Sequence, residues 1–234
     1  MNGYTLKLIA MITMFIDHMA AILLPYDSAA YLICRYIGRL AFPIFCFLLV
    51  EGFEHTHNVK RYMARLGIFA LISEIPFDLA FSNKSLKYGY LLHQNVFFTL
   101  FIGLVVIWGM RIISIKLTQN TTLSRFLSSL LQGIVVMTGC FAAYFLYTDY
   151  DYKGVFLIVA FYVFRKRKVI LTLAVLLVNL IFGMVIQLFA AASMVFIWWY
   201  NGKRGPQGNK YLFYIFYPAH ILFLYLISLL PVFH

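Results

Sequence analysis

Ionisable side chains stand inside several long apolar stretches of this sequence, where a charge is costly to bury and by default indicates function. These residues are Asp17, His18, Arg35, Arg39, Glu74, Asp78 and His220. A histidine in such a place can act as a general base, whereas buried carboxylates and guanidinium groups must pair with one another. We therefore take these residues as the candidate catalytic set.

The arginines and the two later carboxylates have matching spacings. Arg35 and Arg39 are four positions apart, as are Glu74 and Asp78, so each pair is expected on one face of a helix. In antiparallel neighbouring helices, Arg35 would lie level with Asp78 and Arg39 with Glu74. The sequence thus predicts two ion pairs or one shared network. This network either only neutralises the charges and fixes the packing, or also supports catalysis.

Each of the two histidines allows a structural and a functional interpretation. His18 directly follows Asp17, and neighbours on a helix point about 100° apart, so Asp17 is not automatically its partner. His18 is either a hydrogen-bonded structural residue or a general base. His220 follows Pro218, which is expected to kink its helix, within an aromatic run that is typical of interfacial packing as well as of ligand binding. Which histidine acts as the base stays open.

The composition indicates whether the protein that positions these residues lies in water or in a membrane. The chain has 234 residues, of which 63% are hydrophobic and only 12% are charged. Such a composition excludes a soluble globular domain, a disordered chain and a disulfide scaffold, and favours a membrane protein. We expect one all-α domain over 1–234, a polytopic integral membrane helical bundle with about nine spans (range about 8–10).

The expected spans follow from the apolar stretches, because a helix needs about 20 apolar residues to cross a bilayer. They are about 5–24, 29–50, 62–82, 95–113, 127–147 and 154–164, two short spans in 169–200 divided near Gly183, and a last span at about 211–230. The formal charge of +11 also fits a membrane protein, because 14 of the 19 Lys and Arg residues fall in the segments expected on one side of the membrane, either in loops or near the ends of spans. This pattern predicts a cytoplasmic N-terminus and indicates no nucleic-acid partner.

Two loops on the expected cytoplasmic side carry further polar groups. After the second span, His55 and His57 are two residues apart, a spacing that diverges on a helix, so we expect no metal site there. Before the last span, Lys203 and Arg204 lie between Gly202 and Gly205. Such a turn can present backbone N–H groups and cations to phosphates, or the cations can simply set the topology.

Ordered motifs along most of the chain resemble those of the TraX family of membrane proteins. The matching segments are Leu6–Met11 with Ile16-Asp17-His18, Arg35–Phe45, Glu51–Phe53 with His55-Thr56, Ile72–Leu79, Asn95–Leu100, Asp151-Tyr152 with Gly154, Tyr200–Gly205 and Phe213–His220. The namesake of this family is an acetylase that modifies the N-terminal amine of conjugative pilin. The chain also resembles the broader superfamily of multi-pass membrane acyltransferases, which use acyl-CoA, although its arginine pair is one residue wider than theirs.

The resemblance implies an acetyltransferase in the cytoplasmic (inner) membrane of a bacterium. Acetyl-CoA would be the donor substrate, with its phosphates held by Lys60, Arg61, Arg65, Lys203 and Arg204. His18 would take a proton from an acceptor amine or hydroxyl at the outer face, with Arg35 or Arg39 stabilising the oxyanion. The acceptor would be a peptide or pilin N-terminus, or a glycan or lipid of the cell envelope, and no metal is expected.

A transporter or flippase for small molecules or lipids is the alternative function. Prolines within the spans and a buried charge network also suit alternating access. Acetyl transfer from acetyl-CoA separates the two functions.

Overall fold

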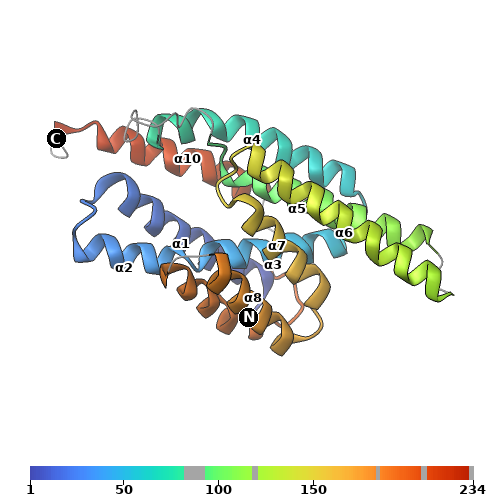
Figure 1. Cartoon of the computed structure of the whole chain (residues 1–234). Coiled ribbons are helices and arrows are strands. Elements are labelled where there is room, and N and C mark those ends of the chain that lie inside the picture. Colours follow the sequence, from blue (N-terminus) through green and yellow to red (C-terminus); the bar gives the residue numbers. More distant parts are fainter. Residues whose placement is uncertain (82–92, 118–120, 183–184, 207–209, 232–234) are drawn as a thin grey trace.

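The regular secondary structure of the described residues consists of helices, apart from an isolated bridge between Gln94 and Thr148. The computed structural model describes residues 1–81, 93–117, 121–182, 185–206 and 210–231. In chain order its helices are α1 (Gly3–Leu23), α2 (Ala29–Gly38), α3 (Ala41–His55), α4 (Val59–Phe81), α5 (Val96–Lys116), α6 (Thr122–Phe145), α7 (Asp151–Phe164), α8 (Lys168–Phe182), the 3₁₀ segment η3 (Val185–Ala192), α9 (Ser193–Trp198) and α10 (Lys210–Ser228) (Figure 1). The all-α prediction is confirmed.

Five helical segments are long and apolar enough to cross a membrane. They are α1, the combined run Ala29–His55, α5, α6 and Tyr211–Ser228 of α10. Helix α4 is equally long but carries more charged residues, and α7 and α8 are shorter. Large apolar side chains such as Leu71, Ile75 and Leu123 are 67%, 69% and 75% exposed, as expected where lipid replaces water. The count of about nine spans and the orientation stay predictions.

The expected second span is divided into α2 and α3 at Arg39 and Leu40. Pro43, the third residue of α3, has no N–H to donate to the carbonyl of Arg39, which lies four residues earlier. Both Arg39 and Leu40 keep right-handed helical dihedral angles, so the chain continues in a similar direction. The break places Arg39 at a helix junction rather than within a continuous span.

Helix α1 packs against α2, α3 and α10, whereas α4 packs against α5 and α10 (Figure 1). The first residues of the chain also hold the loop that follows α9. The N–H groups of Gly3 and Tyr4 donate to the carbonyls of Lys203 and Arg204 over 2.8 and 2.9 Å. These bonds satisfy donors that the first turn of a helix leaves free. They fix the loop containing Arg204 beside the start of α1.

A second ion cluster ties three helices together away from the candidate residues. The Glu54 carboxylate in α3 contacts Arg111 of α5 at 2.9 Å and Arg165, after α7, at 2.6 Å. The Arg111 guanidinium also lies over the Phe53 ring, 4.5 Å from its centroid. One carboxylate therefore joins the ends of α3, α5 and α7.

Candidate functional site

Asp17 is the partner of both candidate arginines. Its Oδ2 accepts from Arg35 Nη1 at 2.6 Å, and its Oδ1 accepts from Arg39 Nη2 at 3.0 Å. The three side chains are 12%, 24% and 11% exposed, in that order. Two charge-assisted bonds to one carboxylate fix both guanidinium groups relative to α1. The cluster carries one positive charge more than Asp17 neutralises.

The predicted pairing of Arg35 with Asp78 and of Arg39 with Glu74 is wrong. Helix α2 packs against α1, whereas α4, which carries both carboxylates, packs against α5 and α10. Glu74 instead accepts a hydrogen bond from the side-chain amide of Asn95, the residue that caps α5. The equal i,i+4 spacings did not lead to pairing, because α2 and α4 do not pack against each other as the prediction required.

Gly38 allows Asp17 to approach the backbone of α2. A Cβ atom added at Gly38 would lie 2.1 Å from Asp17 Oδ1 and 2.3 Å from Asp17 Cβ. Only a residue without a side chain leaves room for this contact between α1 and α2. The ion cluster therefore depends on a glycine one position before Arg39.

Replacing Gly38 with alanine is expected to lower the melting temperature, because the new methyl group must push α1 away from α2 and separate Asp17 from the arginines. Overpacking of this kind costs about 1–3 kcal/mol. Thermal unfolding of the purified protein in detergent measures it. Gly133→Ala in α6 is the matched control, since nothing lies within 4 Å of its added Cβ. That change is expected to be neutral or stabilising, and equal losses at both glycines would contradict the packing explanation.

The two candidate histidines form one hydrogen-bonded pair. His18 Nδ1 lies 2.7 Å from His220 Nε2, and the two ring planes differ by 2°. With centroids 5.0 Å apart, the rings are edge to edge in one plane. The other nitrogen of His220, Nδ1, lies 2.7 Å from the carbonyl oxygen of Phe216. The contact between α1 and α10 brings these two distant parts of the sequence together.

The Phe216 carbonyl decides the proton positions in this chain of bonds. A carbonyl oxygen only accepts, so His220 Nδ1 must carry a proton and donate it. In a neutral His220, Nε2 is then the acceptor, and His18 Nδ1–H donates to it. The lone pair on His18 Nε2 then has no hydrogen-bond partner among the described residues. Of the two histidines, His18 is thus arranged to accept a proton from a substrate.

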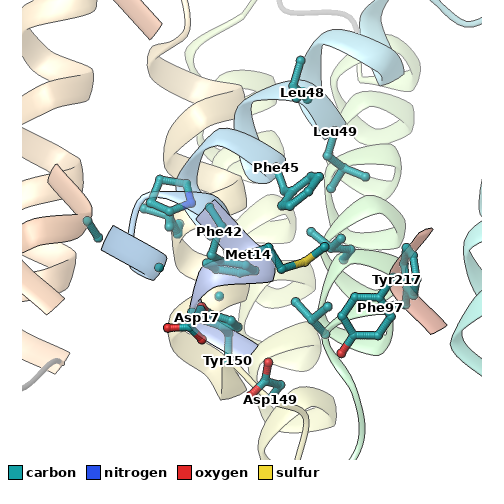
Figure 2. A pocket seen from close by; sticks show the side chains of 18 of the residues that line it. Met14, Asp17, Phe42, Phe45, Leu48, Leu49, Phe97, Asp149, Tyr150 and Tyr217 are labelled. Carbon is teal, nitrogen blue, oxygen red and sulfur yellow. The ribbon is translucent and has the colours of Figure 1, made fainter. Parts of the chain in front are cut away.

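One cavity of about 1630 Å³ connects this region with the basic start of α1. His18, Asp17 and Arg35 line it, and Lys7 lines it about 16 Å away along α1, given a rise of 1.5 Å per residue. Figure 2 shows Asp17, Asp149 and Tyr150 gathered in one part of this cavity, with Phe45, Leu48 and Leu49 along another. The cavity therefore combines charged and apolar walls.

Some of the predicted phosphate-binding residues line this cavity and others do not. Arg65 and Arg204 are lining residues, and Arg204 donates to the carbonyl of His55 at 3.2 Å. Among the described residues, the lining does not include Lys60, Arg61 or Lys203. Of the remaining candidates, Asp78 lines the cavity, whereas Glu74 and His220, which the structure also describes, are not lining residues. Sequence periodicity could not show which side chains of the basic loops turn inwards.

Lys7, Asp149 and Tyr150 are among the lining residues that were not site candidates from the sequence. The Lys7 ammonium group lies over the Phe213 ring, 4.9 Å from its centroid. Asp149 and Tyr150 lie between α6 and α7, where the Asp149 N–H donates to the Gln94 carbonyl at 2.8 Å. Their loop position gave no helical pattern that could have marked them.

Tyr200 and Glu51 form a polar contact at the same end of the cavity as Arg204. Burial of the Tyr200 hydroxyl and the neighbouring Glu51 carboxylate raise the pKa of Tyr200 to about 12. The phenol therefore stays protonated at neutral pH and donates to Glu51. The described residues contain no group of three His, Cys, Asp or Glu side chains arranged to hold a metal ion.

Comparisons with known proteins match almost the whole chain. A family model described as TraX protein matches residues 2–228. A relative from Dichelobacter nodosus, described as "Probable fimbrial assembly protein FimC, serogroup H1", is 33% identical over 249 aligned residues. The alignment covers 95% of this chain and 94% of that relative. No solved structure matches the chain.

Proposed function

This chain belongs to the TraX family, and on that premise we propose that it is a multi-pass acetyltransferase of the bacterial inner membrane. It moves an acetyl group from cytoplasmic acetyl-CoA to an acceptor amine or hydroxyl at the outer face. One observation carries this proposal: a single cavity contains both a set of cations and an imidazole with a free lone pair. The cations can bind the phosphates of an anionic donor, and the imidazole can take the proton that the acceptor loses.

The cations at the start of α1 and α4 suit the phosphates of the donor. Arg65, Arg204 and Lys7 line this part of the cavity. Arg65 Nε is buried and has no hydrogen-bond partner among the described residues, so it is available to a ligand. Guanidinium groups bind phosphate through charge-assisted hydrogen bonds. From there the narrow pantetheine arm extends past the apolar wall of Phe45 and Leu48 towards His18.

His18 supplies the proton transfer in the proposed reaction. The acceptor nitrogen or oxygen attacks the thioester carbonyl carbon, and His18 Nε2 takes the proton that the acceptor loses. The tetrahedral intermediate then breaks its C–S bond, and His18 returns the proton to the sulfur of the leaving CoA. His220 holds the reacting tautomer of His18 through the bond to His18 Nδ1, and Asp17 keeps Arg35 and Arg39 near the reacting atoms.

The relative's description as a fimbrial assembly protein supports a peptide acceptor, such as a pilin N-terminus. A glycan or lipid of the cell envelope has the same nucleophilic groups and is the other acceptor class. The test uses purified protein in detergent with radiolabelled acetyl-CoA and a synthetic peptide that has a free N-terminal amine. Label on the peptide amine supports the proposal. No label on the peptide, together with solute movement into proteoliposomes that contain the same protein, would support a transporter instead.

Replacing Arg65 with alanine is expected to raise the KM for acetyl-CoA by about 10–100-fold while kcat changes little, because a charged hydrogen bond contributes about 1.5–3 kcal/mol. Initial rates over a range of acetyl-CoA concentrations measure this effect. Arg61→Ala is the matched comparison, since Arg61 lies on the same helix, is exposed and is not among the described lining residues. Equal increases in KM for both variants would indicate long-range attraction instead of binding within the cavity.

A further inference from the structure

Tyr217 of α10 has a buried hydroxyl group whose proton has no hydrogen-bond acceptor among the described residues. The residue is 2% exposed and lines the cavity. Among the described residues, its hydroxyl has no hydrogen-bond partner within ordinary distance and angle limits. The nearby N–H of Val96 interacts with the hydroxyl oxygen outside these limits, and an N–H can only donate. The phenolic proton therefore still lacks an acceptor in the described chain.

An unsatisfied buried hydroxyl is costly, at about 1–3 kcal/mol. Native proteins rarely keep one unless a ligand or water completes its hydrogen bonding. The position of Tyr217 inside the cavity indicates that its missing acceptor arrives with a ligand.

Neighbouring rings hold Tyr217 at the level of the proposed base. Its ring meets the His18 ring edge to face, with centroids 5.8 Å apart and planes at 70°. It meets the Phe97 ring in the same way, at 5.0 Å and 77°. Figure 2 shows Tyr217 beside Phe97 at the cavity, with Asp149 and Asp17 in the same view. A ring packed on two sides keeps one orientation, which is what a preorganised donor requires.

We propose that Tyr217 is a catalytic residue whose hydroxyl donates a hydrogen bond to the carbonyl oxygen of the acetyl thioester. This inference rests on the proposed acetyl transfer. When the acceptor attacks the carbonyl carbon, the C=O electron pair moves to the oxygen, and the Tyr217 O–H bond stabilises that charge. The pair returns as the C–S bond breaks, and Tyr217 keeps its proton throughout.

The arginines are less suited to this role, although the sequence analysis gave it to them. Arg35 and Arg39 both donate to Asp17, which offsets part of their charge. Arg39 Nε is also bonded, to the carbonyl of Arg35 at 3.3 Å. The Tyr217 proton has no such competing acceptor among the described residues. The arginines therefore contribute positive electrostatic potential around the site, whereas Tyr217 donates the hydrogen bond to the thioester carbonyl oxygen.

The test replaces Tyr217 with phenylalanine, which removes only the hydroxyl. We expect kcat for acetyl transfer to fall by about 10²–10³-fold, the usual loss for one oxyanion donor, with the KM for acetyl-CoA nearly unchanged. Because the hydroxyl lacks an acceptor, the melting temperature should stay the same or rise. Tyr225→Phe is the matched control, since Tyr225 lies two turns further along α10 and is not among the described lining residues.

A second readout is the infrared carbonyl band of acetyl-CoA labelled with ¹³C at the acetyl carbonyl. Binding to the wild-type protein should lower its frequency, and Tyr217→Phe should remove that shift. Wild-type kcat in an active Tyr217→Phe variant, or an unchanged band shift, would overturn the role of Tyr217 alone. A wild-type protein that transfers no acetyl group would instead overturn the proposed function on which this role rests.

Discussion

Replacing His18 with alanine is expected to reduce acetyl transfer by about 10²–10⁴-fold, the range for a positioned general base. The physical reason is the free lone pair on His18 Nε2, which the hydrogen bonds through His220 to the Phe216 carbonyl maintain. Initial rates with radiolabelled acetyl-CoA measure the loss. Ile12→Ala on the same helix is the control, because Ile12 is 59% exposed on the outside of the bundle.

His220→Ala separates the two histidines. It removes the acceptor of the His18 Nδ1 proton, so the base loses its fixed tautomer but keeps its nitrogen. The loss of activity should therefore be smaller than in His18→Ala. If His220→Ala were the more damaging variant and His18→Ala kept most of its activity, the base assignment would be reversed.

Replacing Asp17 with alanine is expected to destabilise the protein by about 3 kcal/mol, near the low end for a broken buried ion pair. The change leaves two guanidinium groups, those of Arg35 and Arg39, without their carboxylate at the junction of α2 and α3. Denaturant unfolding of the purified protein in detergent measures the loss. Glu74→Gln is the control, because an amide oxygen can still accept from the side chain of Asn95.

Comparing Asp17→Ala with Glu74→Gln also distinguishes the observed ion cluster from the pairing of Glu74 with Arg39 that the sequence spacing favoured. A partnership of Glu74 with Arg39 would make Glu74→Gln the costly change and Asp17→Ala the mild one. The observed geometry requires the opposite order.

The sequence identified several residues of the candidate site, but it did not predict which side chains they pair with. Scarcity of charge identified Asp17, His18, Arg35 and Arg39, and the structure places all four in one region. The carboxylate that pairs with the arginines is determined by which helices pack together. Periodicity within one helix carries no information about its neighbours.

Contacts between distant parts of the chain were equally invisible to the sequence analysis. His18 and His220 are 202 positions apart, and only the packing of α1 on α10 brings them together. The division of the second span near Arg39 could have been anticipated, since Pro43 removes one helical hydrogen bond. Tyr217 was one aromatic residue in a run of several, and only its unpartnered hydroxyl distinguished it.

The proposed function requires acetyl groups to pass from acetyl-CoA at one membrane face to an acceptor at the other. The most direct measurement uses proteoliposomes with radiolabelled acetyl-CoA on one side only and a peptide with a free N-terminal amine on the other. Labelled peptide is expected with the wild-type protein, and little or none with His18→Ala. Peptide that stays unlabelled with the folded wild-type protein, or label transfer that is equally fast in His18→Ala, would contradict it.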